Sequence, residues 1–168
     1  VLDSAVTLSP IEARCGDPQV IATWGDLAEI QNKPAAPDSI HWGASRAARD
    51  VLLGNVRRMH AAGIPIAVGS NGGNIGTLQG PSFHRELEML AEAGLTPTDV
   101  LTCATANGAL ALGVLGDRGT VEVGKLADLV LIGADPNEDV SSLAIIETVL
   151  VGGEVVFSRD QNANEGDP

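Results

Sequence analysis

The sequence predicts an α/β fold in which a buried parallel strand ends in a polar, glycine-rich loop. A short apolar run at residues 64–68 stops abruptly at small, polar and glycine residues over 69–74. Such a run is typical of a strand that is buried on both faces of a parallel sheet. An amphipathic segment that ends at Gly63 predicts the preceding helix. Because the carboxyl ends of parallel strands carry active sites, we expect the chemistry in the 69–74 loop.

The chain before this strand is predicted to be largely irregular. Residues 1–8 end in a β-branched run, and residues 9–45 contain repeated prolines without clear periodicity. A connection of this length predicts a short helix around residues 20–30. We interpret it as a surface connection, with a lid or substrate-binding loop as the alternative. Ser39 is a suitable N-cap for the following helix, whose apolar residues between 44 and 59 recur at helical spacing.

Two helices are predicted after the loop. Residues 84–93 place apolar side chains partly inward, and residues 97–112 are rich in Ala and Leu, which is typical of a buried helix. Thr96 can cap the second helix, Pro97 fits its first turn, and Asp99 complements its dipole. We therefore expect this helix to begin at Pro97.

The pattern changes to β after Gly116. Short strands are predicted at residues 119–123, 127–132, 148–151 and 154–157. Gly152 and Gly153 separate the last two runs and predict a two-residue hairpin turn. The polar residues 159–168 are predicted to form a disordered tail.

Composition limits the classes of partner. The 168 residues include 10 Lys and Arg against 22 Asp and Glu, which gives a net charge of −12. Such an acidic surface argues against nucleic acid and anionic membranes as partners. No apolar run approaches the ~20 residues that a membrane-spanning helix needs. No secretory signal segment is recognisable, so a cytoplasmic location is expected.

Five motifs follow one another over about residues 50–157 and together carry a resemblance. They are Gly69-Ser70-Asn71-Gly72-Gly73-Asn74, Ser82-Phe83-His84-Arg85-Glu86-Leu87, Glu92-Ala93-Gly94-Leu95-Thr96-Pro97, Ala104-Thr105-Ala106-Asn107, and Gly124-Lys125-Leu126-Ala127-Asp128-Leu129-Val130. In this order they resemble the amidohydrolase superfamily, above all its imidazolonepropionase- and prolidase-like members. The last motif, followed by Ala134-Asp135-Pro136, is the most specific of the set.

The resemblance implies the last strands and helices of a (β/α)8 TIM barrel, followed by strands of a small β-sandwich. Residues 1–116 would form the C-terminal part of the barrel, residues 117–158 the sandwich strands, and residues 159–168 the tail. The histidine ligands of the family have no counterpart in this sequence. The few barrel strands cannot close an eight-stranded barrel and would leave an exposed edge. The chain is therefore expected to pair with an N-terminal barrel portion or to form a homo-oligomer.

Asn71 occupies the position at which the resemblance places an Asp that binds metal and accepts a proton. An amide can offer a carbonyl oxygen to a metal but cannot act as a base. One interpretation is therefore an inactivated catalytic position, which would bind metal only if Asn71 were converted to Asp. A second is a labile Asn-Gly pair whose deamidation restores a carboxylate. A third is a turn pair that tolerates positive φ.

Three further residues are candidates for substrate binding: Asn74, Ser82 and His84. His84 follows the loop near the strand end, where the resemblance implies a substrate-contacting or structural histidine. The alternative is a surface histidine at a helix N-terminus. The histidines at positions 41, 60 and 84 lack metal-ligand spacing.

The sequence leaves two functional hypotheses. The first is the C-terminal portion of a metal-dependent hydrolase, with zinc as the implied metal, that acts on amide or cyclic amide C–N bonds of small molecules. The chain alone is then expected to hold no cofactor and to be inactive. The alternative is a non-catalytic structural or interaction subunit.

Overall fold

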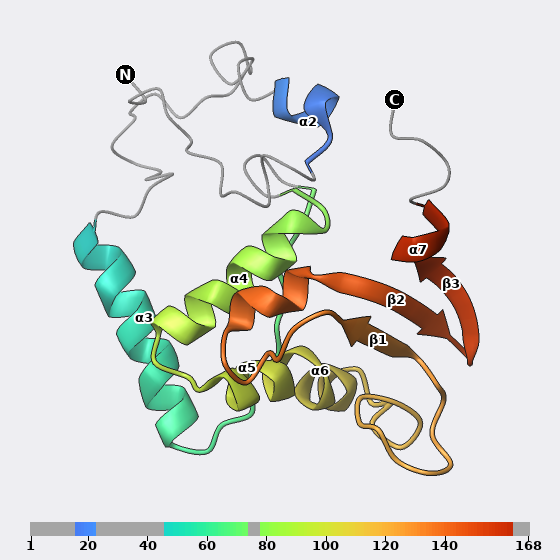
Figure 1. The fold of residues 1–168 in the computed structure, drawn as a ribbon. Coiled ribbons are helices and arrows are strands. Elements are labelled where there is room, and N and C mark those ends of the chain that lie inside the picture. The colour runs from blue at the N-terminus through green and yellow to red at the C-terminus, as the bar shows by residue number, and fades with distance from the viewer. Residues whose placement is uncertain (1–15, 23–45, 74–77, 163–168) are drawn as a thin grey trace.

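A computed structural model describes residues 16–22, 46–73 and 78–162 of the chain. The described residues form helices packed beside a small antiparallel sheet (Figure 1). The first element is the short helix α2, Pro18–Ala22, which overlaps the helix predicted around residues 20–30. Ser39, the predicted N-cap, lies outside the described residues.

Helices α3 (Arg46–Ala61) and α4 (Pro81–Glu92) pack against each other on either side of the candidate loop in the sequence. Gly63 has a φ of 73° directly after α3, as predicted for a residue that ends a helix. The side chain of Arg57 fixes the pair, because its Nε donates a 2.7 Å hydrogen bond to the carbonyl of Ala93 after α4.

Residues 64–68 form an extended segment rather than the predicted strand. A strand is defined by its hydrogen bonds to a neighbour, and no described strand lies beside this segment. The prediction of a buried strand was wrong in pairing and in burial, because residues 64, 65 and 67 are exposed and residues 66 and 68 are only partly buried. Its polar contacts go to helices instead.

The segment predicted as one helix at 97–112 consists of two helices. Helix α5 (Pro97–Ala104) begins with a capping box in which the Thr96 side chain and the Asp99 backbone and carboxylate bond reciprocally. Thr105 has φ −121° and ψ −84°, which interrupts the helical geometry before α6 (Ala106–Ala111).

The sheet has the order β1-β2-β3, with both pairs antiparallel. Strand β1 is Leu129–Ile132, β2 is Ile146–Val151, and β3 is Glu154–Ser158. Gly152 and Gly153 both have positive φ, 60° and 87°, which confirms the predicted two-residue turn. The predicted strand at residues 119–123 is absent, and these residues form turns and bends.

The core joins the helices to the segment between β1 and β2. Helix α4 contributes Leu87, which is 1% exposed, and α5 contributes Val100, which is fully buried. The 3-10 helix η2 (Val140–Ala144) packs Val140 into the same cluster. The two portions predicted at 1–116 and 117–158 therefore share one hydrophobic core in the described structure.

The first residues of the predicted disordered tail are helical. Residues Arg159–Asn162 form the short helix α7, which contacts β2 and β3. Arg159 pairs with the Glu147 carboxylate of β2, which connects the tail to the sheet. The remainder of the predicted tail lies outside the described residues.

Candidate functional site

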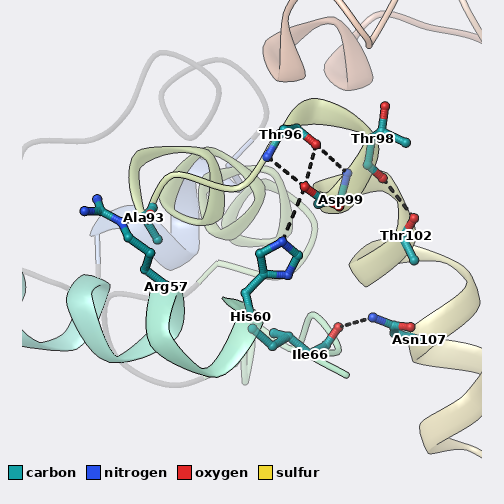
Figure 2. Close-up of polar contacts among 9 residues, drawn as sticks. All are labelled: Arg57, His60, Ile66, Ala93, Thr96, Thr98, Asp99, Thr102 and Asn107. Carbon is teal, nitrogen blue, oxygen red and sulfur yellow. Dashed lines mark hydrogen bonds and ion pairs between the residues drawn. The ribbon is translucent and has the colours of Figure 1, made fainter. Parts of the chain in front are cut away.

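The extended segment that leads to the candidate loop is held by α5 and α6. The Asn107 Nδ2 donates a 2.9 Å hydrogen bond to the carbonyl of Ile66 (Figure 2). The backbone N–H of Val68 donates to the carbonyl of Cys103 at 3.3 Å. Asn107 belongs to the Ala104–Asn107 motif and Cys103 directly precedes it, so this motif region fixes the segment from which the loop leaves.

The loop at residues 69–73 lies against the beginning of α4. The backbone N–H of Gly69 donates to Glu86 Oε1 at 3.2 Å. A Cβ atom on Gly72 would lie 3.4 Å from the Cα of Gln79, which precedes α4. These contacts bring together two of the motifs that carried the family resemblance, and the bonded residues Gly69 and Glu86 are 17 positions apart in the sequence.

Asn71 is exposed in this loop and has a φ of 49°. This left-handed conformation is one that Asn adopts more readily than most residues. The geometry agrees with the turn interpretation, and it also directs attention to an exposed amide at the end of the extended segment. Asn74, the second candidate of the loop, lies outside the described residues.

Ser82 and His84 lie in the first turns of α4. Ser82 is buried, and its Oγ has no hydrogen-bond partner within the described part of the chain. His84 is half-buried, and this burial lowers the pKa of its imidazole below the ordinary value of 6.5. Its ring contacts the ring of Phe83 edge to face, with the centroids 5.7 Å apart.

The donor set of the described residues does not fit a metal centre. Over residues 16–22, 46–73 and 78–162, no group of three His, Cys, Asp or Glu side chains could hold an ion. His60, at the end of α3, faces Asp99 of α5 instead of the loop (Figure 2). Asn71 offers one amide oxygen, which is insufficient as a ligand set.

Glu86 makes a contact with the loop that the sequence did not predict. The sequence places Glu86 in the second motif without a partner for its side chain, whereas its carboxylate accepts the hydrogen bond from Gly69. An acidic residue in the second turn of a helix carries no signal for such a distant partner. Its half-buried position within α4 could be found only once α4 and the loop had been placed together.

Comparison with known proteins decides the family. Residues 35–156 match the profile of the Amidohydrolase family, which is well over half of the chain. The chain belongs to the amidohydrolase family. Two residues that the fold brings together, Gly69 and Glu86, both lie inside the matched range.

The relatives of this chain carry the names of different enzymes. It is 33% identical over 133 residues to 5-methylthioadenosine/S-adenosylhomocysteine deaminase of Moorella thermoacetica, covering 63% of this chain and 29% of that protein. It is 41% identical over 109 residues to imidazolonepropionase of Alkaliphilus metalliredigens, covering 61% of this chain and 25% of that protein. The structure of a candidate prolidase from Bifidobacterium longum superposes with a TM-score of 0.55 at 32% identity, and the match covers 68% of this chain and 30% of that protein.

The chain spans about a quarter to a third of the length of these relatives. The matches confirm the resemblance to the amidohydrolase superfamily that the motifs predicted. The likeness to solved structures supports the fold of this family, in agreement with the mixed helices and strands described here. Within the described ranges, no helix is long and apolar enough to cross a membrane.

Proposed function

We propose that the chain is the C-terminal portion of a metal-dependent amidohydrolase that cleaves C–N bonds of small molecules. The family match is one support, and the names of the relatives, a deaminase and imidazolonepropionases, are another. The share of each relative that is covered, 29% and 25%, agrees with a portion of a larger hydrolase. A divalent metal, zinc by resemblance, would be held by residues that lie largely outside this chain.

The observation that carries the proposal is the position of Asn71. It follows the extended segment 64–68, which α6 holds at Ile66, and it lies in the loop that α4 holds at Gly69. Carboxyl ends of strands are where hydrolases of this architecture place their chemistry. With an amide in this position, the chain lacks the group that would accept a proton, so we expect it to be inactive alone.

The proposed partner is an N-terminal barrel portion. Helix α3 exposes Val51 and Leu52, which are 60% and 58% exposed, and the segment 64–68 pairs with none of the described strands. Exposed apolar side chains beside backbone groups without a neighbouring strand favour association with another polypeptide. A homo-oligomer that buries the same residues is the alternative occupant.

The test combines the chain with an N-terminal barrel portion taken from a relative and measures metal affinity by calorimetry. The Asn71→Asp variant is expected to bind zinc at least about tenfold more tightly than the unchanged chain, since a carboxylate replaces an amide ligand. Asn55→Asp on α3 is the matched control, because it adds the same charge away from the loop. Equal affinities for the two variants would contradict the proposal.

A second candidate function is a non-catalytic interaction subunit. The exposure of Val51 and Leu52 favours it as much as it favours a split enzyme. Native mass spectrometry separates the two: a complex with a larger chain and bound metal supports the hydrolase. A metal-free species built only of this chain, without hydrolysis of amide substrates, supports the interaction subunit.

A further inference from the structure

The chain contains two Asn-Gly pairs in different surroundings, Asn71-Gly72 and Asn107-Gly108. An Asn followed by Gly is chemically labile because glycine leaves the next backbone nitrogen uncrowded. We propose that Asn71 is a site of spontaneous deamidation, which converts its amide to a carboxylate, and that the fold protects Asn107 from the same reaction.

The reaction needs only water as a co-reactant. The backbone nitrogen of Gly72 attacks the side-chain Cγ of Asn71, a C–N bond forms, and ammonia leaves with the proton of the backbone nitrogen. The product is a five-membered succinimide ring. Water then opens either ring carbonyl, which gives aspartate or isoaspartate, and one oxygen of the product comes from water. No oxidant or reductant is involved.

The surroundings of Asn71 permit this ring closure. Asn71 and Gly72 are both exposed, and Asn71 lies outside any described helix or strand, next to a single bridge residue at Gly72. Ring closure requires rotation about the backbone and side-chain bonds of Asn71. An exposed residue outside helices and strands can make these rotations without breaking a helix.

The surroundings of Asn107 oppose the same rotations. Asn107 is half-buried within α6, and its Nδ2 donates the 2.9 Å hydrogen bond to the carbonyl of Ile66. Bringing its Cγ to the nitrogen of Gly108 would break this hydrogen bond and distort the helix. The two pairs therefore share their chemistry and differ in the free energy needed to reach the reactive geometry.

The consequence of deamidation lies at the loop that the proposed function identifies. The new carboxylate adds one negative charge to a chain whose net charge is −12. This inference rests on the proposed function only for that consequence, in which an amide becomes the acidic ligand and base. The chemical conversion itself is independent of metal, partner and activity.

The experiment incubates the purified full chain at pH 8 in ¹⁸O-labelled water, followed by proteolysis and peptide mass spectrometry. The peptide with Asn71 is expected to lose its amide and gain one ¹⁸O atom roughly tenfold faster than the peptide with Asn107, which corresponds to a barrier difference of about 1.4 kcal/mol. Fragmentation identifies the mixture of aspartate and isoaspartate that a succinimide produces.

Gly72→Ala is the variant that isolates the mechanism. Gly72 does not have a positive φ, and an added Cβ would meet Gln79 at 3.4 Å, so alanine fits the fold. The methyl group crowds the attacking nitrogen, and conversion is expected to slow several-fold or more. Gly72→Ala that converts at the unchanged rate, or equal rates at Asn71 and Asn107 in the folded chain, would overturn the proposal. Unfolding in urea should equalise the two peptides, because both then present the same Asn-Gly chemistry.

Discussion

His60 Nε2 lies 3.4 Å from Asp99 Oδ2, which joins the last turn of α3 to the first turn of α5 (Figure 2). The same carboxylate accepts hydrogen bonds from the hydroxyl and the backbone N–H of Thr96, at 2.5 and 3.1 Å. One side chain thus completes a helix cap and contacts a neighbouring helix. The sequence indicated the cap of α5 but not the contact with His60.

Thr96→Ala is expected to lower the free energy of unfolding by about 1 kcal/mol, which is typical for the loss of an N-cap. The variant removes the oxygen that accepts from the backbone of Asp99. Thr102→Ala, within the same helix, is the matched control and should have a smaller effect, because its hydroxyl only bonds back to the carbonyl of Thr98. Urea denaturation followed by circular dichroism measures both. A Thr102→Ala effect as large as that of Thr96→Ala would argue against the cap.

Asp99 is expected to make the stability of the chain depend on acid pH. Thr96 hydrogen bonds, first among several causes, lower the pKa of the Asp99 carboxyl below its ordinary value of 3.8. The folded state therefore binds fewer protons than the unfolded state, so this stabilisation is complete above 3.8 and is lost as the pH falls through the lower folded pKa. Asp99→Asn should flatten the decline in melting temperature between pH 4 and pH 2. A decline as steep as in the unchanged chain would contradict this role.

His84 is expected to titrate below 6.5 in the folded chain. Burial disfavours the imidazolium and lowers the pKa of the ring. The unfolded chain then takes up the proton first as the pH falls. The stabilisation that comes from the neutral ring is present above 6.5 and is lost as the pH falls through the folded pKa. NMR titration of the His84 ring protons, compared with a peptide spanning residues 81–88, measures the difference. A folded midpoint equal to that of the peptide would disprove the prediction.

Gly119→Ala is expected to destabilise the fold by about 1–3 kcal/mol, as overpacked or conformationally incompatible sites do. Gly119 has a φ of 95°, and an added Cβ would lie 2.5 Å from the Cβ of Ala109. Gly116→Ala is the control, since no atom lies within 4 Å of its added Cβ and its φ is not positive. Thermal denaturation should separate the two variants clearly. A Gly116→Ala loss equal to that of Gly119→Ala would point to a general effect of alanine in this loop.

Lys125→Met is expected to lower the free energy of unfolding by about 2 kcal/mol, because two acceptors lose the charged group that donates to them. Its Nζ donates to the carbonyl of Leu115 at 2.9 Å and to the hydroxyl of Thr120, and its side chain is only 13% exposed. Glu122→Gln removes the charge of an exposed carboxylate that pairs with Lys125 at 3.7 Å and hydrogen-bonds with Thr120, and it should change stability much less than Lys125→Met. Equal losses in the two variants, by urea denaturation, would assign the effect to charge rather than to the buried hydrogen bonds.

Local sequence signals predicted the parts of the fold that local chemistry determines. Thr96, Pro97 and Asp99 predicted the start of α5, and Gly152-Gly153 predicted the turn between β2 and β3. These positions depend on backbone conformation and on partners within a few residues. The structure confirms them for that reason.

Long-range partners could not be predicted in the same way. The run at 64–68 has the composition of a buried strand, but pairing depends on neighbouring strands that the described residues do not supply. The contact of Glu86 with Gly69, and that of Asn107 with Ile66, join residues far apart in the sequence. Periodicity along one segment contains no information on such contacts. The resemblance of the motifs located the loop, and the structure identified the hydrogen bonds that hold it and the preceding segment.

The hydrogen bond from Asn107 to Ile66 affects how fast another strand could pair with the segment 64–68. Restricting a backbone to one conformation costs about 1–2 kcal/mol of conformational entropy per residue. In this chain the extended segment has already lost that freedom, since hydrogen bonds from α5 and α6 hold it. A strand that paired with this segment would meet a preorganised template. Its capture would then resemble the docking of rigid surfaces, with rates set by diffusion and orientation rather than by coupled folding.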